Sequence, residues 1–510
     1  MMSSQDETSP SAQVQEETKP VARVIKTATP SSRTNENNTS DGHESDDPVP
    51  HLHAKTFLAV FAVCLIYIAQ LISLVGAGAQ GQTIASHFSS PTQSIWFSAP
   101  ITILTVVLGP ITSQAAGYWG RKWFLVIPTF LGGGVVLVGV SSPKRLLRKS
   151  LSTREKLARL IWGGYFFLAV GLVLFSVALS YSRNPFEWRD PQVSATFAVG
   201  MQLVIGLVLY ETWIKKDGMF HHKLFTGNRN FAVAMFCVFS EGVAFFAANT
   251  YFAFQVSVLY ESDALLGGVR YSLIMIIAAV FACLTGWYCA VTKRVKWATF
   301  AAFGMFIAFF IGMATTTRQT GLPTWGYAVL LGSALSTTLT TLVTVAQLST
   351  PPELISVASG LIISIRSLGR TVGLAVYNAL FHDVMKNLGN NVGKVVVPKG
   401  ISLDDVEMFV IALEAQDQKR LGTISGVTAN IIEAGAIALQ DTFVVAFRHV
   451  WIAGACFVAL AAAVSLLLFD PKKEFNMHID ASVEKEEDLY SVSYWDRSES
   501  LHKGACKLKA

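Results

Sequence analysis

Three charged side chains lie inside apolar stretches that are long enough to cross a membrane. Glu241 is near the middle of residues 231–254, and Arg366 and Arg370 lie within residues 354–380. An ionised side chain at mid-bilayer costs at least about 2.5–3.5 kcal/mol on insertion scales, so such residues usually pair with one another or have a function. We therefore predict that Glu241 faces Arg366, and that Arg370 lies one turn on, on the same helical face.

A carboxylate beside an arginine could carry a proton. It stays ionised while it is paired, and it takes up a proton when it is left alone in apolar surroundings. A conformational change that separates Glu241 from Arg366 could therefore load and release a proton, and Arg370 is a third candidate for this coupling. The alternative interpretation is a buried ion pair that only docks two helices.

The elements that must hold these side chains are membrane helices. Hydrophobic residues make up 52% of the 510 residues, charged residues 15%, and the mean hydropathy is +0.44. This is too apolar for a soluble protein, and a helix of about 20 residues spans the hydrocarbon core. We predict an all-α polytopic membrane protein with about eleven spans. They cover residues 56–78, 95–115, 123–142, 160–181, 193–213, 231–254, 269–291, 297–316, 325–347, 354–380 and 447–469.

Loop charge orients these spans, because Lys and Arg near a span favour the cytoplasmic side. Lys215 to Arg229 mark one cytoplasmic loop, and Lys293 to Lys296 mark a second. Residues 1–50 are polar and almost free of apolar side chains, which predicts a disordered tail. Residues 471–510 form a second polar tail. We expect a multi-pass protein of the plasma membrane with both tails in the cytoplasm.

The loop charges disagree around residues 143–159. This segment has seven basic residues and one acid, which places it in the cytoplasm, yet a complete span at 123–142 would deliver it to the exterior. It could be an amphipathic helix on the membrane surface. Otherwise an odd number of spans is missing, or residues 123–142 turn back without crossing. The run Gly132–Gly134 would ease such a break.

Residues Ser113–Lys122 resemble the loop motif between helices two and three of the major facilitator superfamily. Residues 160–390 and Phe475–Asp480 are similar to a fungal fourteen-helix branch, the trichothecene efflux pump or siderophore transporter type. The resemblance implies a two-lobed bundle in which about three helices of the N-terminal lobe are absent. Its parts would be a truncated N-terminal lobe (56–142), a basic cytoplasmic loop (143–159), two linker helices (160–213) and a C-terminal lobe (231–469) with a long extracellular loop (383–446).

The loop motif departs from the family pattern. Arg121 and Lys122 match it, but Gly117 stands where the family usually has Asp and Ser113 where it has Gly. In the family, that Asp is thought to hold the two lobes together in one state, so the resemblance implies a weaker lock. With Gly120, these residues are our candidates for a gating loop. Alternatively, Arg121 and Lys122 only pin the loop to the cytoplasmic leaflet.

Polar residues within the spans could line a central cavity. The candidates are Gln70, Asn249, Tyr251, Gln255 and Gln347, and the aromatic run Phe245–Phe252 would suit a bulky, mostly apolar ligand. Small and polar residues in membrane helices also serve as packing faces, so the two interpretations stand side by side.

No phosphate-binding glycine loop, catalytic triad or zinc-ligand spacing is present in the sequence. We therefore expect neither an enzyme nor an ATP-driven pump, and no cofactor or metal. The resemblance implies proton-coupled efflux of a hydrophobic small molecule such as a toxin, drug or secondary metabolite. Alternatives are a siderophore–iron uptake symporter and a truncated membrane protein that does not transport. Expected partners are the lipid bilayer, the substrate and protons, with no nucleic acid, and we expect a monomer.

Overall fold

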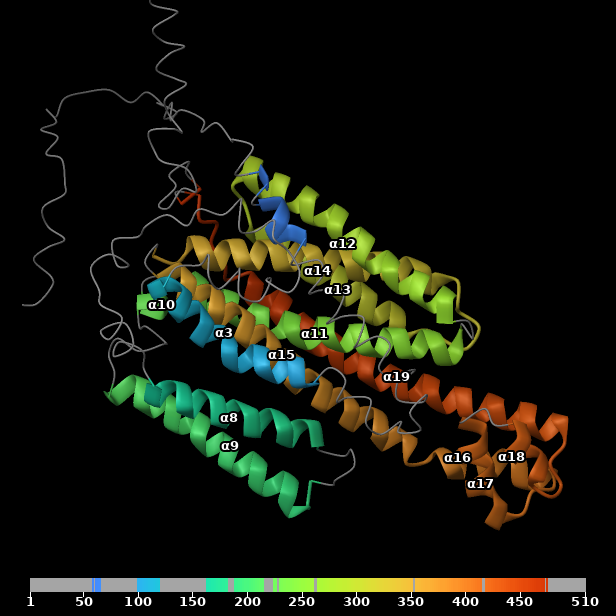
Figure 1. Ribbon diagram of the computed structural model, residues 1–510. Coiled ribbons are helices and arrows are strands. Elements are labelled where there is room, and N and C mark those ends of the chain that lie inside the picture. Colours follow the sequence, from blue (N-terminus) through green and yellow to red (C-terminus); the bar gives the residue numbers. More distant parts are fainter. Residues whose placement is uncertain are drawn as a thin grey trace, which may run out of the picture. The chain divides into compact units, whose positions relative to one another are not determined.

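The computed structural model describes residues 57–65 without 59, 99–119, 162–181, 188–214, 223–226, 229–260, 264–351, 354–414, and 418–475 without 473. All of these belong to one unit, Val49–Ala510. In this part of the chain every regular element is a helix, which confirms the all-α fold class (Figure 1). The predicted span 123–142, the basic loop 143–159, most of span 56–78 and both tails beyond these limits lie outside the described residues.

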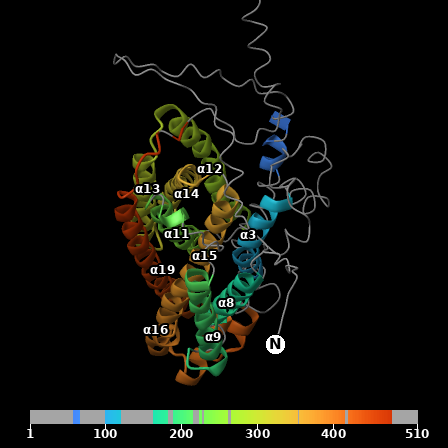
Figure 2. The ribbon, with the colours of Figure 1, turned by 90° about the vertical axis from the view of Figure 1, so that its left-hand side faces the viewer.

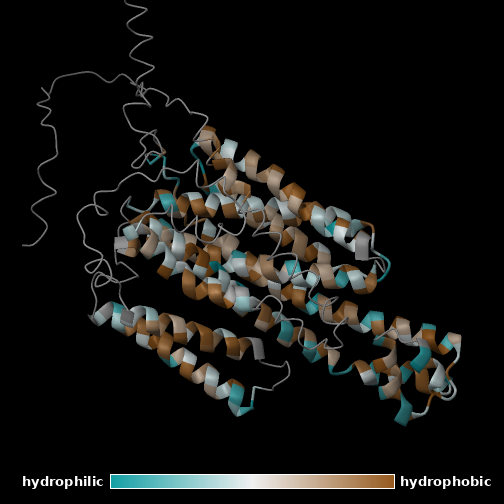
Figure 3. Cartoon of the chain, in the orientation of Figure 1, coloured by the Kyte–Doolittle hydropathy of each residue, from teal (hydrophilic) through white to brown (hydrophobic). Residues whose placement is uncertain are grey.

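The apolar stretches form the long helices that the hydropathy predicts. Seven helices in the described ranges are long and apolar enough to cross a membrane, and α3 and α8 contain shorter apolar stretches at Ile103–Ala116 and Gly163–Leu179. The long helices are α3 (Ala99–Trp119), α8 (Trp162–Tyr181), α9 (Pro191–Leu209), α11 (Arg229–Leu259), α12 (Ala264–Thr292), α13 (Lys296–Ala314), α14 (Pro323–Leu348), α15 (Ile355–Met385) and α19 (Ala429–Ser465). Each of them overlaps a predicted span, and apolar residues run along their length (Figure 3).

Helix α11 is at the centre of the packing. It contacts α15, α19 and α14, and α13 lies against α14 and α19 (Figure 2). Trp451 of α19 is fully buried, with its ring centroid 5.7 Å from that of Phe309 and 5.9 Å from that of Phe310. A second, smaller apolar cluster joins α3, α8 and α9, and α3 packs along α15.

The sequence predicts a long loop at 383–446 that holds two stretches with helix-like spacing, Asp404–Leu413 and Gly426–Leu439, and in the structure most of this segment is helical. Helix α15 continues to Met385, and α19 begins at Ala429, eighteen residues before the predicted span at 447. Between them lie α16 (Leu388–Val396), η6 (Val397–Lys399), η7 (Leu403–Asp405), α17 (Val406–Glu414) and α18 (Gln418–Thr423), gathered near the first half of α19 (Figure 1).

The first half of α19 is helical although it is too polar to read as a membrane span. Glu433, Gln440 and Asp441 lower its hydropathy, but a helix satisfies its backbone hydrogen bonds locally whatever its side chains are. Its apolar side packs on α16 and α17, where the Phe409 ring lies directly over Gly435. Hydropathy alone locates the predicted membrane span at 447–469, whereas the helix begins eighteen residues earlier.

Asp470, just beyond the end of α19, caps the start of α13. Its Oδ1 accepts hydrogen bonds from the backbone N–H groups of Val295 at 2.7 Å and Lys296 at 2.9 Å, two donors without a partner inside the helix. We expect Asp470→Ala to lower the stability by about 0.5–2 kcal/mol and Asp470→Asn to lower it less. Thermal unfolding in detergent measures both, and equal midpoints for wild type and Asp470→Ala would contradict the cap.

Candidate functional site

Glu241 of α11 and Arg366 of α15 form a two-pronged ion pair. Arg366 Nε donates to Glu241 Oε2 at 2.6 Å, and its Nη2 donates to Oε1 at 2.9 Å. The Glu241 side chain is 1% exposed and that of Arg366 is 16% exposed. This fork geometry is the strongest form of charge-assisted hydrogen bond between side chains. The two residues therefore pair as the sequence predicted, while a role in proton coupling stays a prediction.

Glycines on both helices allow this pair to form. A Cβ on Gly242 would lie 2.2 Å from the backbone oxygen of Arg366, and one on Gly369 would lie 2.2 Å from the backbone oxygen of Phe239. Only glycine permits backbones to approach this closely. In the structure the pair lies where α11 and α15 are in direct contact.

Arg370 lies on the same side of α15 as Arg366, as predicted. Its guanidinium carbon is 4.6 Å from the centre of the Phe246 ring, and that of Arg366 is 5.2 Å from the same ring. Arg370 is 3% exposed, and its Nε has no hydrogen-bond partner. Among the described residues, Glu241 is thus hydrogen-bonded to Arg366 alone, and Arg370 stacks on the same Phe246 ring without an ion pair.

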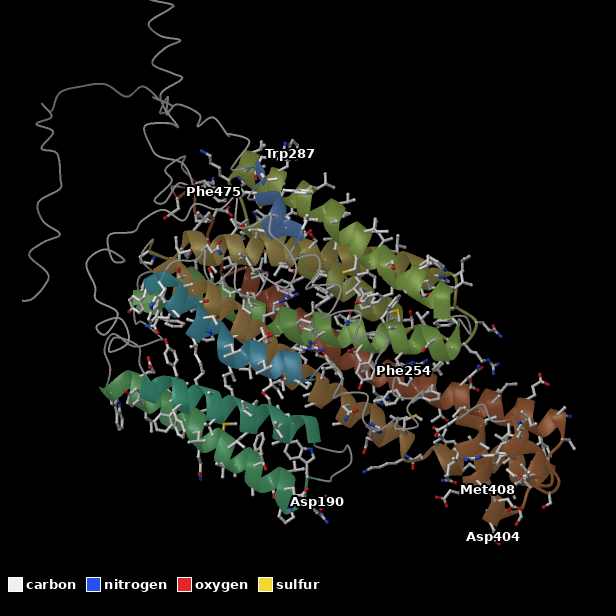
Figure 4. The ribbon with its side chains drawn as sticks, in the orientation of Figure 1. Asp190, Phe254, Trp287, Asp404, Met408 and Phe475 are labelled. Atoms are coloured by element: carbon white, nitrogen blue, oxygen red, sulfur yellow. The ribbon has the colours of Figure 1, made fainter. Side chains whose placement is uncertain are left out.

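Two of the predicted cavity residues are buried between helices. The carboxamide oxygen of Asn249 accepts a hydrogen bond from the hydroxyl of Tyr271 on α12, and Asn249 is 3% exposed. Tyr251 lies among the rings of Tyr377, Phe381 and Phe447. Phe254, which is labelled in Figure 4, extends this cluster toward α15 and α19. Rings from three helices therefore meet at this level of the bundle.

Gln255 and Gln347 connect helices through hydrogen bonds. Gln255 is 1% exposed; its Oε1 accepts from Trp451 Nε1 at 2.7 Å, and its Nε2 donates to Thr316 Oγ1 at 2.8 Å. Gln347 Nε2 donates to Ser359 Oγ at 3.2 Å. For Gln255 the packing interpretation fits better than the cavity one, because its amide oxygen is bonded to Trp451 of α19 and its amide nitrogen to Thr316, just past the end of α13. Gln70 lies outside the described residues.

Only part of the predicted gating loop can be placed. Ser113 lies on α3 against α15, where a Cβ on Gly360 would be 2.6 Å from the Ser113 Cβ and 2.8 Å from the Gly109 backbone oxygen. One turn along α15, Ser364 donates to the backbone oxygen of Val106 at 2.8 Å. Gly117 belongs to α3, and Gly120, Arg121 and Lys122 lie outside the described residues. Ser113 therefore takes part in a close contact between α3 and α15.

Sequence reasoning missed Arg270, near the start of α12. It is 5% exposed, donates from Nη1 to the Gly321 backbone oxygen at 3.1 Å and to Thr324 Oγ1 at 2.7 Å, and lies 4.8 Å from the Trp325 ring. Arg270 lies just inside the predicted span 269–291, and a charge at that position could have identified it as a candidate. Within the described ranges, no group of three or more His, Cys, Asp or Glu side chains could hold a metal ion.

Residues 150–374 match the family model described as Major Facilitator Superfamily. The chain carries a major facilitator superfamily domain. The matched range includes α8 to α14 and the first two thirds of α15, so Glu241, Arg366 and Arg370 all lie inside the major facilitator domain. The match to this family model and the apolar helices make the protein a multi-pass membrane protein.

The chain is also similar to several fungal transporters. It is 20% identical to the trichothecene efflux pump TRI12 of Trichoderma arundinaceum over 75% of this chain and 65% of the relative. It is 24% identical to the MFS-type transporter pigP of Monascus ruber over 61% and 56% of the two chains. It is 22% identical to the probable efflux pump gsfJ of Penicillium aethiopicum over 58% and 54%. The chain thus spans between about half and two thirds of the length of these relatives.

Among solved structures, the chain is similar to a bacterial homolog of the human lysosomal transporter Spinster in an inward-facing, unoccupied conformation. The sequence identity is 15% and the TM-score is 0.41, with 82% of this chain and 97% of that chain covered.

Proposed function

We propose that this protein is a secondary active transporter that exports a hydrophobic small molecule, such as a toxin or secondary metabolite, in a cycle coupled to protons. The observation that carries the proposal is the ion pair of Glu241 with Arg366, buried between α11 and α15. The Glu241 carboxylate is paired with the Arg366 guanidinium, and a conformational change that removes this partner would favour protonation of the carboxylate. Proton exchange at Glu241 would then accompany the movement of the bundle.

The relatives support the outward direction. TRI12 of Trichoderma arundinaceum is a trichothecene efflux pump, and gsfJ of Penicillium aethiopicum is a probable efflux pump. The aromatic side chains beside the pair support an apolar substrate, because both Phe245 and Phe246 lie within 6 Å of the Arg366 guanidinium. These rings would pack against the apolar portion of a ligand, and the charged groups would bind its polar portion.

Transport by the full chain in inside-out membrane vesicles tests this function. The vesicles would be loaded at acidic pH, diluted into neutral buffer and offered rhodamine 6G, a radiolabelled trichothecene or fluorescein. If the protein exports substrate in exchange for protons, at least one probe will accumulate in the acidic lumen, and a protonophore will abolish the accumulation. Vesicles without the protein provide the baseline.

The two alternatives give different results in the same experiment. An uptake symporter would release a preloaded probe from the acidic lumen faster than control vesicles do, because proton and substrate leave together. A protein that does not transport would match control vesicles under every gradient, as expected if the pair of Glu241 and Arg366 only docks two helices. Either outcome would overturn the proposal of proton-coupled efflux.

A further inference from the structure

Arg370 is a buried cation without a counter-charge in the part of the chain that the structure describes. It is 3% exposed, its Nε makes no hydrogen bond, and its guanidinium makes no ion pair. Glu241 is already occupied on both oxygens by Arg366. The three side chains therefore carry a net charge of one positive unit inside the helical bundle. A buried charge is retained in proteins when something compensates it, and here no described side chain does.

The polar side chains that α11 and α12 add beside Arg370, Asn249 and Tyr271, are uncharged amide and hydroxyl groups and supply no counter-charge. Tyr271 is its electrostatic neighbour from α12, and the Tyr271 hydroxyl already donates to the carboxamide oxygen of Asn249. The amide oxygen of Asn249 is therefore occupied, and its amide N–H group remains available as a hydrogen-bond donor. Phe246, one turn before Asn249 on α11, lies under the guanidinium. The site on α11, α12 and α15 thus offers a cation, an amide donor and an aromatic face, a combination that fits an aromatic or aliphatic acid.

Resting on the proposed transport function, we propose that the substrate is a hydrophobic organic anion, and that Arg370 binds its carboxylate or ionised phenol while Phe246 contacts its apolar body. Hydrophobic contacts alone would not distinguish such an anion from a neutral ligand of the same size. The ligand supplies the negative charge that the protein lacks. A cationic substrate would face two guanidinium groups, which repel it.

Binding of one matched pair of probes to the purified full-length protein tests this site. Pyrenebutyrate and pyrenebutanol share a ring system and chain length and differ in charge, and pyrene fluorescence reports their binding. We expect wild type to prefer the acid by about ten-fold or more, as hydrogen bonds to a charged group would give. Arg370→Gln should reduce this preference to about one, and Arg370→Lys should keep part of it. Arg294→Gln, which removes an exposed arginine, should leave it unchanged.

Thermal unfolding of the ligand-free variants separates binding from a structural role. If Arg370 serves a ligand, Arg370→Gln removes an uncompensated charge, so its unfolding midpoint should equal or exceed that of wild type. A lower midpoint with the acid preference intact would overturn the proposal, and so would equal binding of the two probes to wild type. Because neither measurement needs transport, the site can fail while pH-driven efflux succeeds, and acid binding can be found in a protein that does not transport.

Discussion

Glu241→Gln is expected to abolish proton-coupled transport while the protein still folds and inserts. Gln keeps the size of the side chain and can still accept a hydrogen bond from Arg366, but it cannot exchange a proton between pH 4 and 8. Downhill movement of substrate should persist and lose its dependence on the pH gradient. The measurement is probe accumulation in inside-out vesicles with and without the gradient. Glu433→Gln, the same change at an exposed position of α19, should behave like wild type.

A double variant decides between coupling and helix docking. Arg366→Met alone leaves Glu241 buried without a partner, and breaking a buried pair in this way typically costs about 3–5 kcal/mol. Glu241→Leu combined with Arg366→Met replaces both charges with apolar side chains and should recover most of that stability. If the pair only docks α11 against α15, this double variant will also transport against a gradient. Recovery of stability without recovery of accumulation would establish the coupling role.

Gly369→Ala is expected to be, with Gly242→Ala, among the most disruptive additions of a single methyl group in the described helices. The added Cβ would lie 2.2 Å from the backbone oxygen of Phe239, an approach that forces α11 and α15 apart. Overpacking of this kind costs about 1–3 kcal/mol or more, and the shift would also disturb Glu241 and Arg366. The checks are the thermal midpoint of the purified protein and its folded yield in the membrane fraction.

Matched glycines provide the control for this variant. Gly286 of α12 and Gly304 of α13 are also mid-helix, but a Cβ there meets nothing within 4 Å. Alanine at either position should keep or raise the stability by up to about 1 kcal/mol, because alanine favours helix more than glycine does. If Gly369→Ala behaves like Gly286→Ala, the close contact of α11 and α15 is not a feature of the folded protein.

The long helices and the central ion pair could be predicted from the sequence because each depends on a strong local signal. An apolar run of about 20 residues has few alternatives to a membrane helix. A carboxylate in mid-span needs a partner, and Arg366 was one of only two mid-span cations considered. The first half of α19 escaped this reasoning because Glu433 and Asp441 interrupt its apolar pattern while α16 and α17 pack on its apolar side.

Which polar residues of the site are free to meet a ligand depends on contacts between helices, and the spacing of residues in the sequence does not show these contacts. Gln255 was a candidate for the cavity wall, yet its amide is engaged by Trp451 of α19 and by Thr316, just past the end of α13. That Arg370 has no carboxylate partner among the described residues follows from where its neighbours lie in three dimensions. The closeness of α11 to α15 follows from which glycines face each other. The proposed loss of N-terminal helices stays a prediction, because residues 123–159 lie outside the described part of the chain.

The contact between Gly242 and Arg366 has a kinetic consequence. Because the two backbones touch, Glu241 and Arg366 are carried by a helix pair that moves as one piece, and the pair can open only by rotation of its side chains. Side-chain rotation is orders of magnitude faster than the rearrangement of whole helices. Breaking and re-forming of the two hydrogen bonds between Glu241 and Arg366 would therefore be fast compared with any movement of whole helices.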